Sequence, residues 1–217
     1  MIQTKPSHPT FTCPSFNSRV VPVIVITDVS QAVPLAFALL EGGIDVMEIT
    51  LRNSFGLLAI EAVARQVPQM HVGAGTVTRA EDMLRVKAAG ARFALSPGLT
   101  QAIVHAAMQC EIPFIPGVMS PSEVMNAQDL GFTLVKFFPA VQSGGLNMLK
   151  AFSGPLEDMR FCPTGGITEN NMLDFLRLPN VSMVGGSWIT PLNLMENGHW
   201  KEITRLARQV TEATGTS

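Results

Sequence analysis

The chain has 217 residues, a length that suits one α/β barrel domain, since such domains commonly have about 200 to 250 residues. Apolar residues make up 47% of the chain, but no apolar run reaches the roughly 18 residues that a membrane span requires. The formal net charge of −2 and the absence of a basic cluster argue against nucleic acid or an anionic membrane as a partner.

The first 19 residues, MIQTKPSHPTFTCPSFNSR, lack the continuous apolar segment of a secretory signal peptide. We interpret residues 1–19 as an N-terminal arm and residues 20–217 as one domain. The cysteines Cys13, Cys110 and Cys162 form no CxxC pair, a pattern typical of reduced thiols. We therefore expect a cytoplasmic protein.

Short apolar runs rich in β-branched residues alternate with amphipathic stretches along the chain. The runs predict eight strands, at residues 21–27, 45–50, 71–77, 92–97, 113–118, 133–139, 160–166 and 181–187. The stretches between them, such as 30–43, 55–67 and 80–91, predict helices. This alternation favours a single-domain (β/α)₈ TIM barrel over an open doubly wound sheet.

The second predicted strand ends in MEITLRN, where Glu48 and Arg52 share one face. Active-site groups of a barrel lie at the carboxyl ends of its strands, so this carboxylate and guanidinium are candidates. The alternative is an ion pair between Glu48 and Arg52 on an exposed strand face.

Lys136 lies in the otherwise apolar run GFTLVKFFPA, at residues 131–140. Burial disfavours the charged form of an amine, and a neutral amine is a nucleophile that forms a Schiff base with a carbonyl carbon. Glu48, if within reach, supplies the proton transfers that this chemistry requires. The alternative is an ion-paired lysine whose stem packs among Phe137 and Phe138.

Two glycine pairs, in TGGIT at 164–168 and VGGSWIT at 184–190, follow the last two strands. Their backbone N–H groups predict a phosphate site, although a single pair is more typical of a turn. Thr76 and Thr164, also at strand ends, are by themselves ordinary strand and turn residues. The histidines and cysteines form no ligand cluster, so we expect no metal.

Several of these segments together resemble the 2-keto-3-deoxy-6-phosphogluconate (KDPG) aldolase family, also described as 4-hydroxy-2-oxoglutarate aldolases. The matching segments are GGIDVMEITLR, VGAGTV, ALSPGLT, IPGV, VKFFPA, RFCPTGGI and GGSW. The resemblance implies a class I aldolase that needs no metal or other cofactor and is usually a homotrimer. The implied reaction is reversible cleavage of KDPG to pyruvate and glyceraldehyde 3-phosphate, with 4-hydroxy-2-oxoglutarate cleaved to pyruvate and glyoxylate as a further reaction.

The resemblance also implies roles for individual residues. Lys136 corresponds to the Schiff-base lysine and Glu48 to the general acid/base. The remaining matches hold the keto acid (Arg52, Thr76, Thr164), line the pocket (Pro97, Phe138) or bind phosphate (Gly165, Gly166, Gly185, Gly186, Ser187).

The chain departs from the family pattern after the first strand, where many members carry a basic residue and this chain has Thr27 and Asp28. Two other functions stay open at this point. One is cleavage of the galactonate epimer of KDPG, since the stereochemistry at C4 cannot be read from these residues. The other is a non-catalytic barrel that binds phosphorylated sugars and would need the glycines but not Lys136 with Glu48.

Overall fold

The computed structural model describes residues 14–215 of the chain. Most of the predicted N-terminal arm, with Cys13, lies outside these residues. The last residues of the arm run up to the first strand without regular structure, and the backbone N–H groups of Asn17 and Ser18 donate hydrogen bonds to the Asp45 carboxylate.

Each predicted strand has a counterpart in the structure, and the run at 113–118 is divided into two short strands around Pro116. The strands are β1 (Val20–Ile24), β2 (Val46–Thr50), β3 (His71–Gly75), β4 (Phe93–Leu95), β5 (Phe114–Ile115), β6 (Gly117–Val118), β7 (Leu134–Phe137), β8 (Arg160–Pro163) and β9 (Val184–Gly186).

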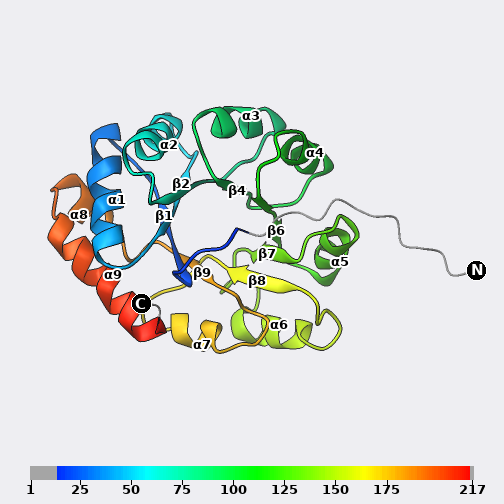
Figure 1. Cartoon of the computed structure of the whole chain (residues 1–217). Coiled ribbons are helices and arrows are strands. Elements are labelled where there is room, and N and C mark those ends of the chain that lie inside the picture. The colour runs from blue at the N-terminus through cyan, green and yellow to red at the C-terminus, as the bar shows by residue number, and fades with distance from the viewer. Residues whose placement is uncertain (1–13, 216–217) are drawn as a thin grey trace, which may run out of the picture.

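Helices follow the strands and lie around the outside of the molecule (Figure 1). They are η1 (Val29–Gln31), α1 (Ala32–Glu41), α2 (Phe55–Gln66), α3 (Ala80–Ala88), α4 (Gln101–Gln109), α5 (Pro121–Asp129), α6 (Gly145–Phe152), α7 (Met172–Leu176), α8 (Leu192–Glu196) and α9 (Trp200–Thr214). None of the described helices is long and apolar enough to cross a membrane.

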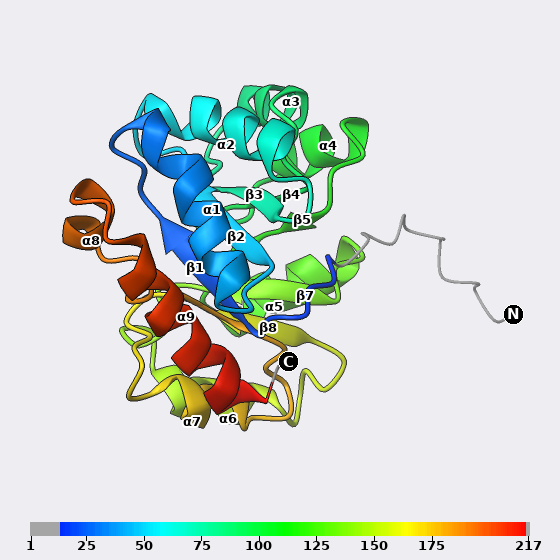
Figure 2. The same cartoon turned by 60° about the vertical axis from the view of Figure 1, so that its left-hand side comes forward.

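All strand pairings are parallel, and they form two sheets. The larger has the order β5-β4-β3-β2-β1-β9, and the smaller has the order β6-β7-β8. Single parallel bridges, Phe161 with Val181 and Thr164 with Gly185, join the β8 region to the β9 region. Figure 2, turned by 60°, shows α1 and α9 side by side across β1. The fold is thus an α/β fold with a curled parallel six-stranded sheet and a second, three-stranded sheet.

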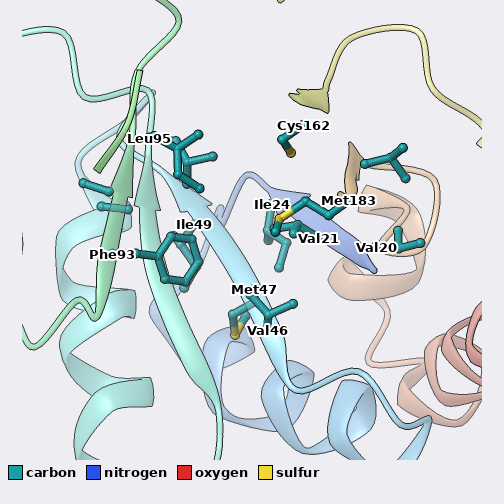
Figure 3. Packing of buried hydrophobic residues seen from close by; sticks show 14 of the residues in the cluster. Val20, Val21, Ile24, Val46, Met47, Ile49, Phe93, Leu95, Cys162 and Met183 are labelled. Atoms are coloured by element: carbon teal, nitrogen blue, oxygen red, sulfur yellow. The ribbon is translucent and has the colours of Figure 1, made fainter. Parts of the chain in front are cut away.

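The strands are buried on both faces, as expected where helices cover a parallel sheet. Ile24 of β1 lies beside Ile49 of β2, and both are fully or almost fully buried, with Phe93 and Leu95 of β4 in the same core (Figure 3). Burying one such side chain contributes about 1.5 to 3 kcal/mol. Against this apolar background, a charged side chain inside β2 or β7 needs a specific partner.

Candidate active site

Lys136 and Glu48 form a buried ion pair that joins the two sheets. Lys136 lies in β7 of the smaller sheet and Glu48 in β2 of the larger sheet. The Lys136 Nζ atom is 3.1 Å from Glu48 Oε1 and 3.4 Å from Oε2. The side chains are only 6% and 1% exposed, so both charges depend on each other for compensation. The alternative pairing of Glu48 with Arg52 is wrong, because Glu48 pairs with Lys136.

The neighbouring residues leave room for this pair. A Cβ atom on Gly75 in β3 would collide with the Glu48 carboxylate, and one on Gly117, the register neighbour of Lys136, would collide with the backbone of Pro97. Glycine at position 75 therefore lets the Glu48 side chain lie close to β3, and glycine at position 117 lets the segment after β4 lie close to β6. Pro97 thus lies against Gly117, the register neighbour of Lys136.

Phe138 connects the ion pair to a cavity of about 500 Å³. The centroid of its ring lies 5.5 Å from Lys136 Nζ, within the range of a cation–π contact. Phe138 also lines the cavity, whereas Lys136 and Glu48 are not among its described lining residues, so the Phe138 ring connects the pair to it. Most of the predicted binding residues line the same cavity: Arg52, Phe138, Thr164, Gly165, Gly166, Gly185, Gly186 and Ser187.

Backbone geometry brings the two glycine pairs together. Thr164 and Gly185 are joined by a parallel bridge, and the backbone N–H of Ala140 binds the carbonyl oxygen of Thr164. Gly165 and Gly166 have φ values of +99° and +79°, a conformation that residues with a Cβ rarely adopt. Glycine at both positions is thus favoured by the turn that forms this side of the cavity.

Thr76 is not brought into this cavity. It lies at the end of β3 directly after Gly75, and it lines a smaller cavity of about 270 Å³ together with Arg79 and Arg85. Its φ of +59° is unusual for a β-branched residue, and such backbone strain typically costs about 1 to 3 kcal/mol. Strain of this kind is concentrated at functional sites, and here it immediately follows the glycine that contacts Glu48.

The loop after β1, where the chain departs from the family pattern, stabilises the start of a helix. The Asp28 carboxylate accepts hydrogen bonds from the backbone N–H and the hydroxyl of Ser30, and Gln31 completes the capping box of η1. The hydrogen bonds from Ser30 lower the pKa of Asp28. Thr27 and Asp28 are not among the described residues that line the larger cavity.

Some lining residues of the larger cavity were not predicted. Val23 and Val25 line it from β1 and the segment that follows, and Thr190 lines it from the end of the motif VGGSWIT. Alternation along the first strand would have placed Val23 and Val25 on one face. Thr190 gave no such signal, because threonine is common in turns. Among the described residues, no group of three or more His, Cys, Asp or Glu side chains is placed to hold a metal ion.

Known proteins are similar to this chain in fold and in sequence. The family model "KDPG and KHG aldolase" matches residues 15–206. A 2-dehydro-3-deoxy-phosphogluconate aldolase of Pseudoalteromonas atlantica is 52% identical over 190 residues, which are 88% of each chain. The KHG/KDPG aldolase of Escherichia coli K12 is 47% identical over 193 residues, covering 89% of this chain and 91% of that protein.

The KDPG aldolase of Legionella pneumophila provides a structural match. Its crystal structure, with pyruvate captured as a covalent carbinolamine intermediate, superposes with a TM-score of 0.87 at 48% identity. The match covers 89% of this chain and 94% of that chain. The chain described here therefore belongs to the KDPG and KHG aldolase family.

Proposed function

We propose that this protein is a class I aldolase that reversibly cleaves KDPG to pyruvate and glyceraldehyde 3-phosphate through a Schiff base on Lys136. Cleavage of 4-hydroxy-2-oxoglutarate to pyruvate and glyoxylate is its second reaction. The observation that carries the proposal is the buried contact between Lys136 and Glu48, beside a cavity lined by the two glycine pairs. The carbinolamine in the Legionella pneumophila relative supports it.

The ion pair supplies both reactive groups at once. Transfer of one proton across the 3.1 Å hydrogen bond converts the Lys136 ammonium and the Glu48 carboxylate into a neutral amine and a carboxylic acid. The amine is then a nucleophile, and the acid is a proton donor next to it.

The reaction begins when Lys136 Nζ adds to the C2 carbonyl of the substrate to form a carbinolamine. Glu48 donates a proton to the leaving hydroxyl, which departs as water and leaves the iminium. Glu48 then takes the proton of the C4 hydroxyl, the C3–C4 bond breaks, and its electron pair moves into the enamine of pyruvate. Protonation at C3 and hydrolysis release pyruvate and restore the lysine.

Binding of the substrate uses the residues around the pair. In this proposal Arg52 and Thr164 hold the keto-acid end, and Pro97 and Phe138 form the wall beside C2, whereas Thr76 lines the smaller cavity. The amides of Gly165, Gly166, Gly185, Gly186 and Ser187 hold the phosphate. Arg52 is the charged residue of the larger cavity's lining, in which the described residues include no carboxylate. An anionic ligand suits such a lining.

The experiment that tests this function is a pyruvate-release assay with three substrates in parallel. They are KDPG, its galactonate epimer and 4-hydroxy-2-oxoglutarate. The proposal requires the highest kcat/KM for KDPG and measurable release from 4-hydroxy-2-oxoglutarate. A preference for the galactonate epimer would mean that the epimer, and not KDPG, is the substrate. No turnover of any of the three compounds would favour the alternative of a non-catalytic phosphosugar-binding protein.

We further propose that the two sheets close into one (β/α)₈ barrel. Pro116 alone separates β5, at the edge of the larger sheet, from β6, at the edge of the smaller sheet. The bridge between Thr164 and Gly185 lies at the other junction. Both junctions support a closed ring of eight strands, with β5 and β6 as the two parts of one strand.

We also propose that the protein is a cytoplasmic homotrimer. Large apolar side chains are exposed on the neighbouring helices α2 and α3, with Leu58 at 54% and Leu84 at 68% exposure. Exposed apolar side chains that cluster are typical of protein interfaces. Light scattering at micromolar concentration tests this assembly, and the mass of a monomer would exclude it.

A further inference from the structure

Thr190 carries a buried hydroxyl without a hydrogen-bond partner. The residue is 6% exposed, and its Oγ1 atom makes no hydrogen bond within residues 14–215. Buried polar groups are nearly always paired, so an unpaired one calls for an explanation. The other such atom in this part of the chain, Asn180 Oδ1, belongs to an amide whose nitrogen binds the Leu149 carbonyl and which lies outside the cavity lining.

The position of Thr190 links it to the anion-binding side of the larger cavity. Its backbone N–H donates to the carbonyl of Ser187 at 3.3 Å, which forms a tight turn after Gly186. Pro191 follows with φ of −58° and has no N–H of its own to offer a ligand. Thr190 lines the same cavity as Arg52, Ser187 and the glycine pairs, so this residue lies at the edge of the proposed phosphate site.

We propose that the Thr190 hydroxyl donates a hydrogen bond to the phosphoryl group of the substrate and thereby raises the preference for phosphorylated over unphosphorylated substrates. This inference rests on the proposed aldolase function and names a specificity residue for it. The hydroxyl is covered by protein atoms, so binding requires a turn about χ1 between staggered rotamers. In return, the charged phosphoryl group accepts a hydrogen bond from the hydroxyl, and such a bond is stronger than one between neutral groups.

The test compares Thr190→Val, which keeps the shape and removes the hydroxyl, with Thr190→Ser, which keeps the hydroxyl. The measured quantity is the ratio of kcat/KM for KDPG to kcat/KM for 4-hydroxy-2-oxoglutarate. We expect this ratio to fall roughly tenfold in the valine variant, the scale of one hydrogen bond to a charged group, and to stay near the wild-type value in the serine variant.

A binding measurement separates this effect from the chemical step. Inhibition of pyruvate release by 3-phosphoglycerate should weaken by a similar factor in Thr190→Val, whereas inhibition by glycerate should not change. Equal losses for both substrates, or a lower melting temperature with an unchanged ratio, would assign Thr190 to structure alone and overturn the inference. Wild-type protein that releases no pyruvate would instead contradict the aldolase function itself.

Discussion

Lys136 and Glu48, which are 88 residues apart in the sequence, meet with Nζ and Oε1 at 3.1 Å in the interior between the two sheets. In this contact the Glu48 side chain can act as a proton donor or as a proton acceptor toward Lys136, depending on which of the two groups holds the proton. Each of the two charges is buried together with a partner of opposite charge, because a single unpaired charge at either position would be costly.

Glu48→Gln tests the proton transfers. The amide keeps the size and hydrogen-bonding capacity of the side chain but exchanges no protons, so we expect kcat to fall by about 10² or more. The exposed Glu61→Gln in α2 is the matched control and should keep the wild-type rate. A Glu48→Gln variant with nearly normal kcat across the pH range would mean that another group moves the protons.

Gly75→Ala tests the position of the same carboxylate without removing it. The new Cβ would collide with the Glu48 side chain and displace it from Lys136. A displacement of about 1 Å at a reacting group can reduce the rate about 10²-fold, and we expect a loss of this size in kcat. Gly154→Ala is the control, because no heavy atom lies within 4 Å of its added Cβ. Equal activity of the two variants would contradict the required geometry.

Arg52→Ala tests which end of the substrate the guanidinium holds. Arg52 is exposed and lines the larger cavity, where it can form two parallel hydrogen bonds with a carboxylate. We expect the affinity for pyruvate to fall roughly tenfold, measured by the pyruvate concentration needed for half-maximal borohydride trapping. Arg65→Ala on α2 serves as the control. If only the phosphorylated aldehyde bound more weakly, Arg52 would belong to the phosphate end.

Ser120→Ala tests how much the N-terminal cap of α5, the helix that follows β6, contributes to stability. The Ser120 hydroxyl accepts from the Glu123 N–H, and the Glu123 carboxylate accepts from the backbone N–H groups of Met119 and Ser120. Burial raises the pKa of Glu123, but these hydrogen bonds outweigh it, so the net pKa is lowered. Loss of the cap should reduce the free energy of unfolding by about 1 kcal/mol in urea denaturation.

The lowered pKa of Glu123 also predicts how its contribution to the stability of the protein changes with pH. A carboxyl group whose pKa is lower in the folded state stabilises the protein above its unfolded-state pKa, and this stabilisation disappears as the pH falls through the folded-state pKa. The stability difference between wild type and Glu123→Gln should therefore shrink on acidification. A difference that grew at low pH would contradict this assignment.

The sequence predicted the strands and drew attention to Lys136 in β7 and Glu48 in β2, because charged residues are conspicuous in apolar runs. It could not predict their contact, since strand periodicity fixes a face but not the partner on another sheet. The left-handed backbone of Thr76 and its place in a separate cavity also have no sequence signal. Thr190 was missed because its significance lies in an unpaired hydroxyl, which only packing reveals.

The covalent role of Lys136 is tested by trapping. Pyruvate is the part of the substrate that stays on the enzyme after the C3–C4 bond breaks, so pyruvate alone should form the iminium. Incubation with pyruvate and borohydride should inactivate the enzyme irreversibly. Mass spectrometry should find one reduced adduct per chain, on the peptide that contains LVKFFPA.

Lys136→Arg is the control for this trapping experiment, because a guanidinium keeps the positive charge opposite Glu48 but is not an amine nucleophile. This variant should form no adduct, and treatment of the wild type with EDTA should leave activity unchanged. A lysine that serves only as an ion-pair partner would give no adduct in the wild type, and a metal-dependent aldolase would lose activity with the chelator. An adduct on Lys150, in the last turn of α6, would keep the Schiff-base chemistry but move it away from the pair in the interior.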